Sequence, residues 1–155
     1  MNEFFLAEAE ATAALGTRLA GQLPQRAVVH LHGDLGAGKS TLARALLRAL
    51  GVTGTIRSPT YTLVEQYPLA DGGTALHLDL YRIGDPGELE FLGLDGEPRL
   101  WLVEWPARGQ GALPAADLDV ELAVEHAGRR CRLVPRTPVG EAWLARIMLD
   151  AGLPA

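Results

Sequence analysis

One stretch of the sequence has residue types and a spacing suited to binding phosphate. Two glycines bracket four residues and are followed by Lys and Ser in Gly33-Asp34-Leu35-Gly36-Ala37-Gly38-Lys39-Ser40, with Thr41 next. Glycines let backbone N–H groups converge on phosphate oxygens, and the helix that follows directs the positive end of its dipole toward them. We therefore expect Lys39 to contact the β- and γ-phosphates of a nucleoside triphosphate and the Ser40 hydroxyl to bind Mg²⁺.

The distribution of basic residues points to the same loop. Lysine occurs once among the 14 basic residues, at Lys39, and arginine fills every other basic position. A lysine ammonium is a compact point charge, which suits a phosphate-binding loop at this position. Guanine specificity in G proteins usually rests on an Asn-Lys-x-Asp segment, and a chain whose lysine is already committed cannot contain one. We therefore expect ATP rather than GTP as the nucleotide.

Two carboxylates are placed to complete a site around the triphosphate. Glu104 ends the apolar run 100–103, which has the form of a Walker B strand, and Asp79 ends the alternating segment 75–79. In open α/β sheets such residues lie at the carboxyl ends of strands, beside the phosphate-binding loop. We expect both acids to bind the metal or to orient the attacking nucleophile. The alternative is that one of them forms a solvated ion pair with Arg82 or Arg57.

Two hydroxyl side chains lie in the loop that follows the helix after the glycines. In many P-loop hydrolases a threonine in this region senses the γ-phosphate and changes order with the nucleotide state. Thr60 is the candidate for that role, with Ser58 two residues before it. The alternative is that both hydroxyls only satisfy backbone groups of a turn. The local sequence does not decide between these interpretations.

The elements around these residues alternate between strand and helix. An apolar, β-branched run over 27–31 predicts a strand directly before the glycines, and the breaker-free stretch 42–50 predicts the helix after them. The other predicted elements are helices over about 6–19, 86–92 and 139–151, a strand over 100–103, and hairpins of strands 61–67 with 74–81 and 117–126 with 130–135. This order predicts an α/β, P-loop NTPase-like three-layer fold, with a mixed sheet and flanking helices, as a single P-loop ATPase domain over residues 1–155.

The bulk properties exclude several functions. A net charge of −5 argues against a chain whose main task is to coat nucleic acid or an anionic membrane. A single cysteine, Cys131, rules out an intrachain disulfide and suits a reducing cytoplasm. The N-terminus lacks a positively charged region and no apolar stretch is long enough to span a membrane, so we expect a cytoplasmic protein without a signal peptide.

Two sets of residues keep alternative interpretations. Four histidines occur singly on strand-like segments, at His30, His32, His77 and His126. We expect them to be packed or half-exposed strand residues, since no Cys/His cluster supports a zinc site. Four arginines crowd the last hairpin, at Arg129, Arg130, Arg132 and Arg136. They form either a solvated face or a contact with phosphate, RNA or an acidic partner.

Four motifs in series carry a resemblance to a known family. The first is the glycine loop, and the others are Ser58-Pro59-Thr60-Tyr61-Thr62-Leu63-Val64-Glu65, His77-Leu78-Asp79-Leu80-Tyr81-Arg82 and Leu102-Val103-Glu104-Trp105-Pro106. Together they strongly resemble the TsaE (YjeE) family of bacterial ATPases, over about residues 8–130. The glycine loop alone would be weak support, whereas the four motifs in this order are specific.

The resemblance implies a role in making threonylcarbamoyladenosine, the modified adenosine beside the anticodon of tRNAs that read codons beginning with A. It implies a protein complex with two partners, TsaB and TsaD, through which tRNA is met indirectly. In that complex ATP hydrolysis resets the partners between catalytic cycles and does not itself transfer the carbamoyl group.

The resemblance also assigns roles to residues at matching positions. It implies that Lys39 binds phosphates, that Ser40 and Glu104 hold Mg²⁺, and that Asp79 organises the metal or the attacking water. Thr60 then belongs to a switch-like loop, so that the catalytic set is Lys39, Asp79, Glu104 and Thr60.

Further positions are expected to touch the nucleotide. By the same resemblance, Trp105 lies near the nucleotide, and Ala11 and Thr12 border the adenine. The family often has Thr where this chain has Ser40, and both hydroxyls can ligate Mg²⁺. No motif extends past Gly128-Arg129, so the resemblance gives no roles there.

The first hypothesis is therefore an ATPase that is weak alone and activated by partners. Weak hydrolysis agrees with the lack of a clear arginine finger, for which Arg57, Arg82 or a partner residue are the candidates. A small-molecule P-loop kinase is the alternative, but it needs an acceptor pocket and an Arg-bearing lid, and the Gly-rich loop 108–113 is short for a lid. A third possibility is a nucleotide-dependent binding module with negligible catalysis.

Overall fold

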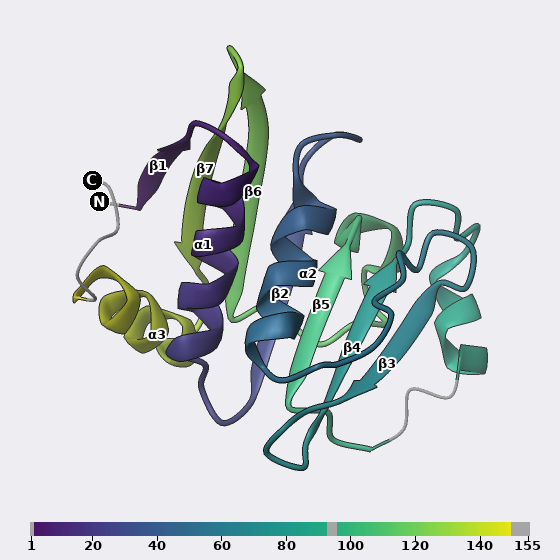
Figure 1. Cartoon of the computed structure of the whole chain (residues 1–155). Coiled ribbons are helices and arrows are strands. Elements are labelled where there is room, and N and C mark those ends of the chain that lie inside the picture. Colours follow the sequence, from purple (N-terminus) through teal and green to yellow (C-terminus); the bar gives the residue numbers. More distant parts are fainter. Residues whose placement is uncertain (1, 93–95, 150–155) are drawn as a thin grey trace.

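The computed structural model describes residues 2–92 and 96–149. Within these residues seven strands form one sheet in the order β1-β7-β6-β2-β5-β4-β3 (Figure 1). The strands are β1 (Glu3–Leu6), β2 (Ala27–His32), β3 (Val64–Pro68), β4 (Thr74–Asp79), β5 (Leu100–Glu104), β6 (Leu118–Glu125) and β7 (Gly128–Pro135). The helices are α1 (Ala9–Gly21), α2 (Lys39–Ala49) and α3 (Pro138–Leu149), with short 3₁₀ helices η1 (Pro86–Leu92) and η2 (Pro106–Gly109).

The centre of the sheet is parallel and its two wings are antiparallel. Strand β2 lies between β5 and β6 and is parallel to both, and β4 is parallel to β5. On one wing β3 pairs antiparallel with β4, and on the other β6, β7 and β1 pair antiparallel in turn. The expected mixed sheet with flanking helices is therefore confirmed, and β2 delivers the glycine loop to the middle of the sheet edge.

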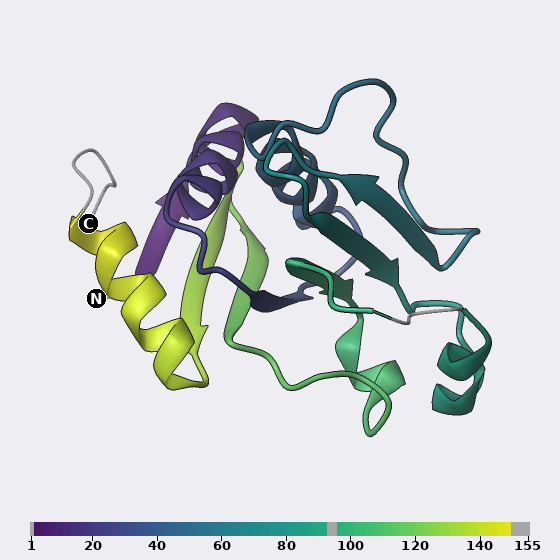
Figure 2. The same ribbon diagram turned by 90° about the horizontal axis from the view of Figure 1, so that it is seen from below.

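The two faces of the sheet are covered differently. Figure 2 shows α1 and α2 on one face, whereas η1 and η2 lie on the other. The larger core lies under α1 and α2, where the alternating residues Ala27, Val29 and Leu31 of β2 are buried. A smaller apolar cluster forms against η1 and includes Leu78 and Leu89. Burial on both faces explains why the central strands are short apolar runs.

Helix α3 joins the fold through an aromatic anchor. The side chain of Trp143 is fully buried, and its Nε1 donates a hydrogen bond of 3.3 Å to the backbone oxygen of Leu19 in α1. Pro138 opens the helix, and the Thr137 hydroxyl accepts a hydrogen bond of 3.1 Å from the Gly140 N–H, which satisfies one free donor of the first turn. The last two residues of the predicted helix, 150 and 151, lie outside the described residues.

Several predicted elements have other boundaries in the structure. The predicted helix from residue 6 is wrong at its start, because Glu3–Leu6 is an edge strand on β7 and the helix begins at Ala9. The first hairpin strand begins at Val64 rather than at residue 61, since Leu63 has a left-handed backbone (φ 69°) that ends the turn. Its partner ends at Asp79 rather than at residue 81. In both strands a turn outweighs an aromatic-rich sequence.

Membrane insertion of a helix has no support within residues 2–92 and 96–149. No helix there has both the length and the apolar character needed to cross a bilayer.

Candidate nucleotide site

The glycine loop lies between the end of β2 and the start of α2. Gly38 caps α2 with a left-handed backbone (φ 106°), a conformation that side chains rarely allow. At Gly33 (φ 152°) a Cβ atom would lie 2.5 Å from the backbone oxygen of Leu122 in β6. Gly38 is therefore needed for its backbone conformation, and Gly33 for its conformation and for space. Without side chains at these two positions, the backbone of the loop stays accessible to an anion.

Lys39 begins α2 and points back over the loop. Its side chain is buried, and Nζ donates a hydrogen bond of 2.6 Å to the backbone oxygen of Gly33. Nζ also lies 4.0 Å from the centre of the Trp105 ring. Burial lowers the pKa of Lys39, and the nearby carboxylates of Glu104 and Asp79 oppose that shift. The ammonium is thus held beside the acids with donors available for a stronger, charged acceptor.

The two predicted acids end neighbouring parallel strands. Asp79 of β4 is directly opposite Glu104 of β5 in the register, and both side chains are buried, with 8% and 4% of their surface exposed. An Asp79 carboxylate oxygen accepts a hydrogen bond of 3.0 Å from the Tyr81 N–H, which orients it in the tight turn after β4. The structure therefore brings the two carboxylates together at the edge of the sheet where α2 begins.

A buried histidine holds one of these acids. Nε2 of His77 donates a hydrogen bond of 2.7 Å to Oε2 of Glu104, and both side chains are almost fully buried. His77 precedes Asp79 by two residues in β4, so both project from the same face of the strand. The expectation of a merely packed strand residue missed this contact. Period-two alternation from Asp79 was the sequence feature that could have revealed it.

Lys39 and the two acids share one pocket with the loop after α2. Its cavity volume is about 270 Å³. Its lining brings together Leu35, Gly36, Gly38, Lys39, Ser40, Thr41, Ser58, Thr60, Asp79, Glu104, Trp105 and Arg129. The hydroxyls of Ser58 and Thr60 are 2.6 Å apart, so they bond to each other while also facing the pocket. Both interpretations of Thr60 remain compatible with this position.

Trp105 follows Glu104 and closes one side of the pocket. Its backbone is left-handed (φ 56°, ψ 51°), an uncommon conformation for a bulky residue. The turn places its ring between Lys39 and the Tyr81 ring, whose centre is 4.9 Å away. Trp105 thus keeps an unfavourable backbone conformation at the position where its ring contacts Lys39.

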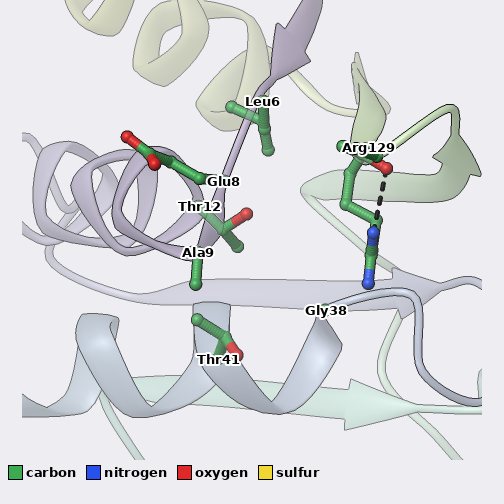
Figure 3. Close-up of a pocket in the computed structure, with 9 residues that line it drawn as sticks. Leu6, Glu8, Ala9, Thr12, Gly38, Thr41 and Arg129 are labelled. Carbon is green, nitrogen blue, oxygen red and sulfur yellow. Dashed lines mark hydrogen bonds between the residues drawn. The ribbon is translucent and has the colours of Figure 1, made fainter.

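A second pocket adjoins the first on the α1 side (Figure 3). It has a cavity volume of about 140 Å³ and is lined by Leu6, Glu8, Ala9, Thr12, Gly38, Thr41, Ala127, Gly128 and Arg129. Thr12 of α1, expected to border the adenine, lines this pocket. Ala11, given the same expected role, does not line it and packs against the core. Both pockets share Gly38, Thr41 and Arg129, so that the two form one continuous lining around the start of α2.

The two arginines considered as arginine fingers do not line the site, whereas one of the four hairpin arginines reaches it. The Arg82 guanidinium lies 4.9 Å from the centre of the Tyr61 ring, and neither Arg82 nor Arg57 lines the two pockets described above. Arg129 instead donates a hydrogen bond of 3.0 Å from Nη2 to the backbone oxygen of Gly36 in the glycine loop. The sequence did not show which of the four arginines reaches the loop, because the contact joins residues 93 positions apart.

The donor set agrees with the expected ligands. Mg²⁺ prefers oxygen ligands and is usually held by one or two carboxylates together with substrate phosphates. Ser40, Asp79 and Glu104 supply such oxygens, and Lys39 supplies a cation for the phosphates. In the part of the chain that the structure describes, no group of three or more His, Cys, Asp or Glu side chains could hold a metal by itself. These residues therefore fit a metal that arrives with a triphosphate.

Comparison with known proteins decides the family. The model of the family "Threonylcarbamoyl adenosine biosynthesis protein TsaE" matches residues 6–132. The chain belongs to the TsaE family. It is 45% identical over 117 residues to a tRNA threonylcarbamoyladenosine biosynthesis protein TsaE from Haemophilus influenzae, covering 74% of this chain and 73% of that protein. It is 38% identical over 138 residues to the Streptomyces coelicolor protein of the same name, covering 83% and 91%.

The fold agrees with this membership. The crystal structure of YdiB from Bacillus subtilis superposes with a TM-score of 0.77 at 25% identity, covering 95% of this chain and 93% of that one. The expected resemblance to TsaE is therefore confirmed. The family match ends in β7, just beyond Arg129, so that both pockets described above lie within it.

Proposed function

We propose that this TsaE family member is an ATPase that acts in the biosynthesis of threonylcarbamoyladenosine on tRNA. The observation that carries the proposal is the convergence of Lys39 and Ser40 with Asp79 and Glu104 in one pocket at the carboxyl ends of β2, β4 and β5. A cation, a hydroxyl and two carboxylates at this edge are the parts that phosphoryl transfer from a nucleoside triphosphate requires.

In this proposal each side chain has a separate task. Backbone N–H groups of the glycine loop and Nζ of Lys39 bind the phosphates and offset their charge. Ser40 and Glu104 would hold Mg²⁺, which when bound would polarise the phosphate oxygens as a Lewis acid. Asp79 orients the attacking water, and Thr60 contacts the γ-phosphate from its loop.

The partners follow from the family rather than from the fold. TsaB-like and TsaD-like proteins form the complex, tRNA is met through them, and hydrolysis resets the complex. Weak hydrolysis by the chain alone is consistent with a site in which Arg129 already donates to a backbone oxygen and no second arginine lines the described pocket. The cytoplasmic location expected from the sequence stays a prediction.

The test is phosphate release measured without an acceptor, with and without the two partner proteins. We expect slow release by the chain alone and faster release with the partners. Lys39→Ala should abolish nucleotide binding or turnover, whereas Arg44→Ala, which removes an exposed cation from the same helix, should change neither. Glu104→Gln should lower turnover more than nucleotide affinity, because the acid acts through the metal.

Two results would refute the proposal. Unchanged activity in Lys39→Ala would remove the phosphate role of the loop. Transfer of labelled phosphate to a metabolite, in place of release to water, would favour the small-molecule kinase.

A further inference from the structure

We infer that Arg129 is a nucleotide-contacting residue whose guanidinium binds the α-phosphate of the nucleotide, at the junction between the two pockets. The inference rests on the proposed nucleotide site and assigns a residue to it that neither the motifs nor the family resemblance placed there. The β6–β7 hairpin, which carries Arg129, lies beside the glycine loop.

Arg129 is the one arginine of the last hairpin that turns toward the loop. Three of the four hairpin arginines form ion pairs with acids: Arg130 with Glu125 at 2.8 Å, Arg132 with Glu121 at 3.7 Å, and Arg136 with Asp119 at 2.6 Å. Arg129 instead donates to two backbone oxygens, to Gly36 at 3.0 Å and to Gly128 at 2.9 Å. The two alternatives expected for this cluster therefore separate: three arginines belong to a charged sheet face and one belongs to the site.

Strand β1 holds the turn end of the β6–β7 hairpin, so that this orientation is built into the fold. A Cβ atom at Gly128 would lie 2.4 Å from the backbone oxygen of Leu6, which shows how closely β1 approaches the hairpin there. Leu6 pairs directly with Arg129 in the β1–β7 register. Figure 3 shows the Arg129 side chain extending from the hairpin toward Gly38 at the start of α2.

The residues that line each pocket indicate which part of a nucleotide it would bind. The metal-binding oxygens and Lys39 lie in the pocket near β4 and β5, which therefore receives the β- and γ-phosphates. The other pocket, with Leu6, Ala9 and Thr12, has none of these acids and suits the nucleoside. The α-phosphate joins these two ends, and the residues common to both pockets are Gly38, Thr41 and Arg129.

A phosphate oxygen is a better hydrogen-bond acceptor for Arg129 than the backbone oxygens that it contacts in the structure. In the structure the guanidinium donates to neutral backbone oxygens, and a phosphate oxygen is a charged acceptor that forms a stronger hydrogen bond. Arginine presents its donors as a planar fork, which matches two oxygens of one phosphate group. Bound nucleotide would therefore move Nη2 from the Gly36 oxygen to the α-phosphate and free that segment of the loop.

The experiment measures Kd by calorimetry for adenosine, AMP, ADP and ATP, for the wild type and four variants. We expect Arg129→Ala to weaken AMP, ADP and ATP by a similar factor of about 10 to 100, the value of one charge-assisted hydrogen bond, and to leave adenosine unchanged. Arg130→Ala removes the neighbouring arginine, which is paired with Glu125, and should match the wild type. The salt dependence of ADP binding should be shallower in Arg129→Ala than in the wild type.

Two conservative variants distinguish a phosphate contact from support of the loop. Arg129→Lys keeps the charge and should recover part of the affinity. Arg129→Gln keeps a neutral donor on a shorter side chain but lacks the charge, and it should bind as weakly as Arg129→Ala. Full recovery in Arg129→Gln would overturn the inference, since the role would then be structural. A loss confined to ATP, with ADP unchanged, would also overturn it and would place the guanidinium at the γ-phosphate.

Failure of the inference and failure of the proposed function give different results. If the wild type binds ADP and ATP and the Arg129 variants bind them equally well, only the inference fails. If the wild type binds no adenine nucleotide, both fail.

Discussion

Replacing His77 with Phe is expected to destabilise the protein by about 2–3 kcal/mol. The substitution keeps a planar ring inside β4 but removes Nε2, which donates to Oε2 of Glu104 at 2.7 Å. Glu104 is 4% exposed, so water has little access to the oxygen that loses its donor. A hydrogen bond to a charged group contributes about 1.5–3 kcal/mol, and an unsatisfied buried carboxylate costs at least as much.

This loss is large enough to measure by two independent methods. For a chain of this length each kcal/mol shifts Tm by about 2–4 °C, so the His77→Phe midpoint should fall by roughly 4–12 °C. Urea unfolding followed by circular dichroism, without nucleotide, gives the free energy of unfolding directly. An unchanged m-value would show that the comparison concerns native stability rather than a change in the unfolded chain.

A double-mutant cycle isolates the pair from other effects of the substitution. Glu104→Leu removes the acceptor, and replacing both partners by apolar groups costs less than the sum of the single changes. We expect the double variant to recover at least about 1 kcal/mol relative to that sum. The exposed pair of Arg26 and Glu97, 3.3 Å apart, is the control and should show a coupling of about 0.2–1 kcal/mol. A loss below about 0.5 kcal/mol in His77→Phe, or full additivity in the cycle, would refute this account of the pair.

Other predictions concern packing, thiol reactivity and pH. Gly140→Ala should cost about 1–3 kcal/mol in urea unfolding, because its Cβ would meet the backbone oxygen of Asp117. Burial raises the pKa of Cys131 to about 12, so a thiol reagent should label it only after unfolding. Burial raises the pKa of Asp119, but hydrogen bonds from His32 and Arg136 outweigh burial and lower it overall. Arg136→Gln should therefore lose about 1 kcal/mol at neutral pH, measured by urea unfolding across pH.

Each of these has a control and a contradicting outcome. Gly21→Ala, at the end of α1 with no atom within 4 Å of the added Cβ, should be neutral or slightly stabilising. Because the folded pKa of Asp119 is lowered, its contribution is present above about pH 3.9 and is lost as the pH falls through the folded value. The difference in the free energy of unfolding between Arg136→Gln and the wild type should vanish at acid pH, and Arg132→Gln should differ less from the wild type at every pH. Rapid labelling of native Cys131, or a difference in the free energy of unfolding that grows in acid, would contradict the predictions.

The phosphate end of the site was predictable because its signals are local. The glycine spacing fixes the loop and the residues after it, and an acid at the end of an apolar run fixes its own place at a strand end. Parallel pairing of β4 with β5 then places Asp79 opposite Glu104, which required only that the two strands be neighbours. His77 follows from Asp79 by period-two alternation and could have been found in the same way.

The nucleoside end was not predictable from local patterns. It depends on β1, a strand of four residues that a helical pattern over the same segment concealed, and on its pairing with a hairpin more than 120 residues away. Short edge strands are defined by their partner rather than by their own sequence. Pairing with β1 fixes the turn end of the hairpin, from which Arg129 reaches the loop, so the arginine cluster alone did not distinguish Arg129 from its neighbours.

The two pockets therefore depend on strand pairings on opposite sides of β2, β4 with β5 on one side and β1 with β7 on the other. A shift of one residue in the β4–β5 register would turn both Asp79 and His77 to the other face, away from Lys39. The same shift between β1 and β7 would move Leu6 away from Arg129 and release the turn end of the β6–β7 hairpin. A nucleotide bound in the proposed way would touch both sides of the sheet and α2 at once, and its full binding free energy would require both registers to be correct. Nucleotide should thus stabilise the whole sheet, and a variant that loosens either pairing should lower affinity without removing any nucleotide contact.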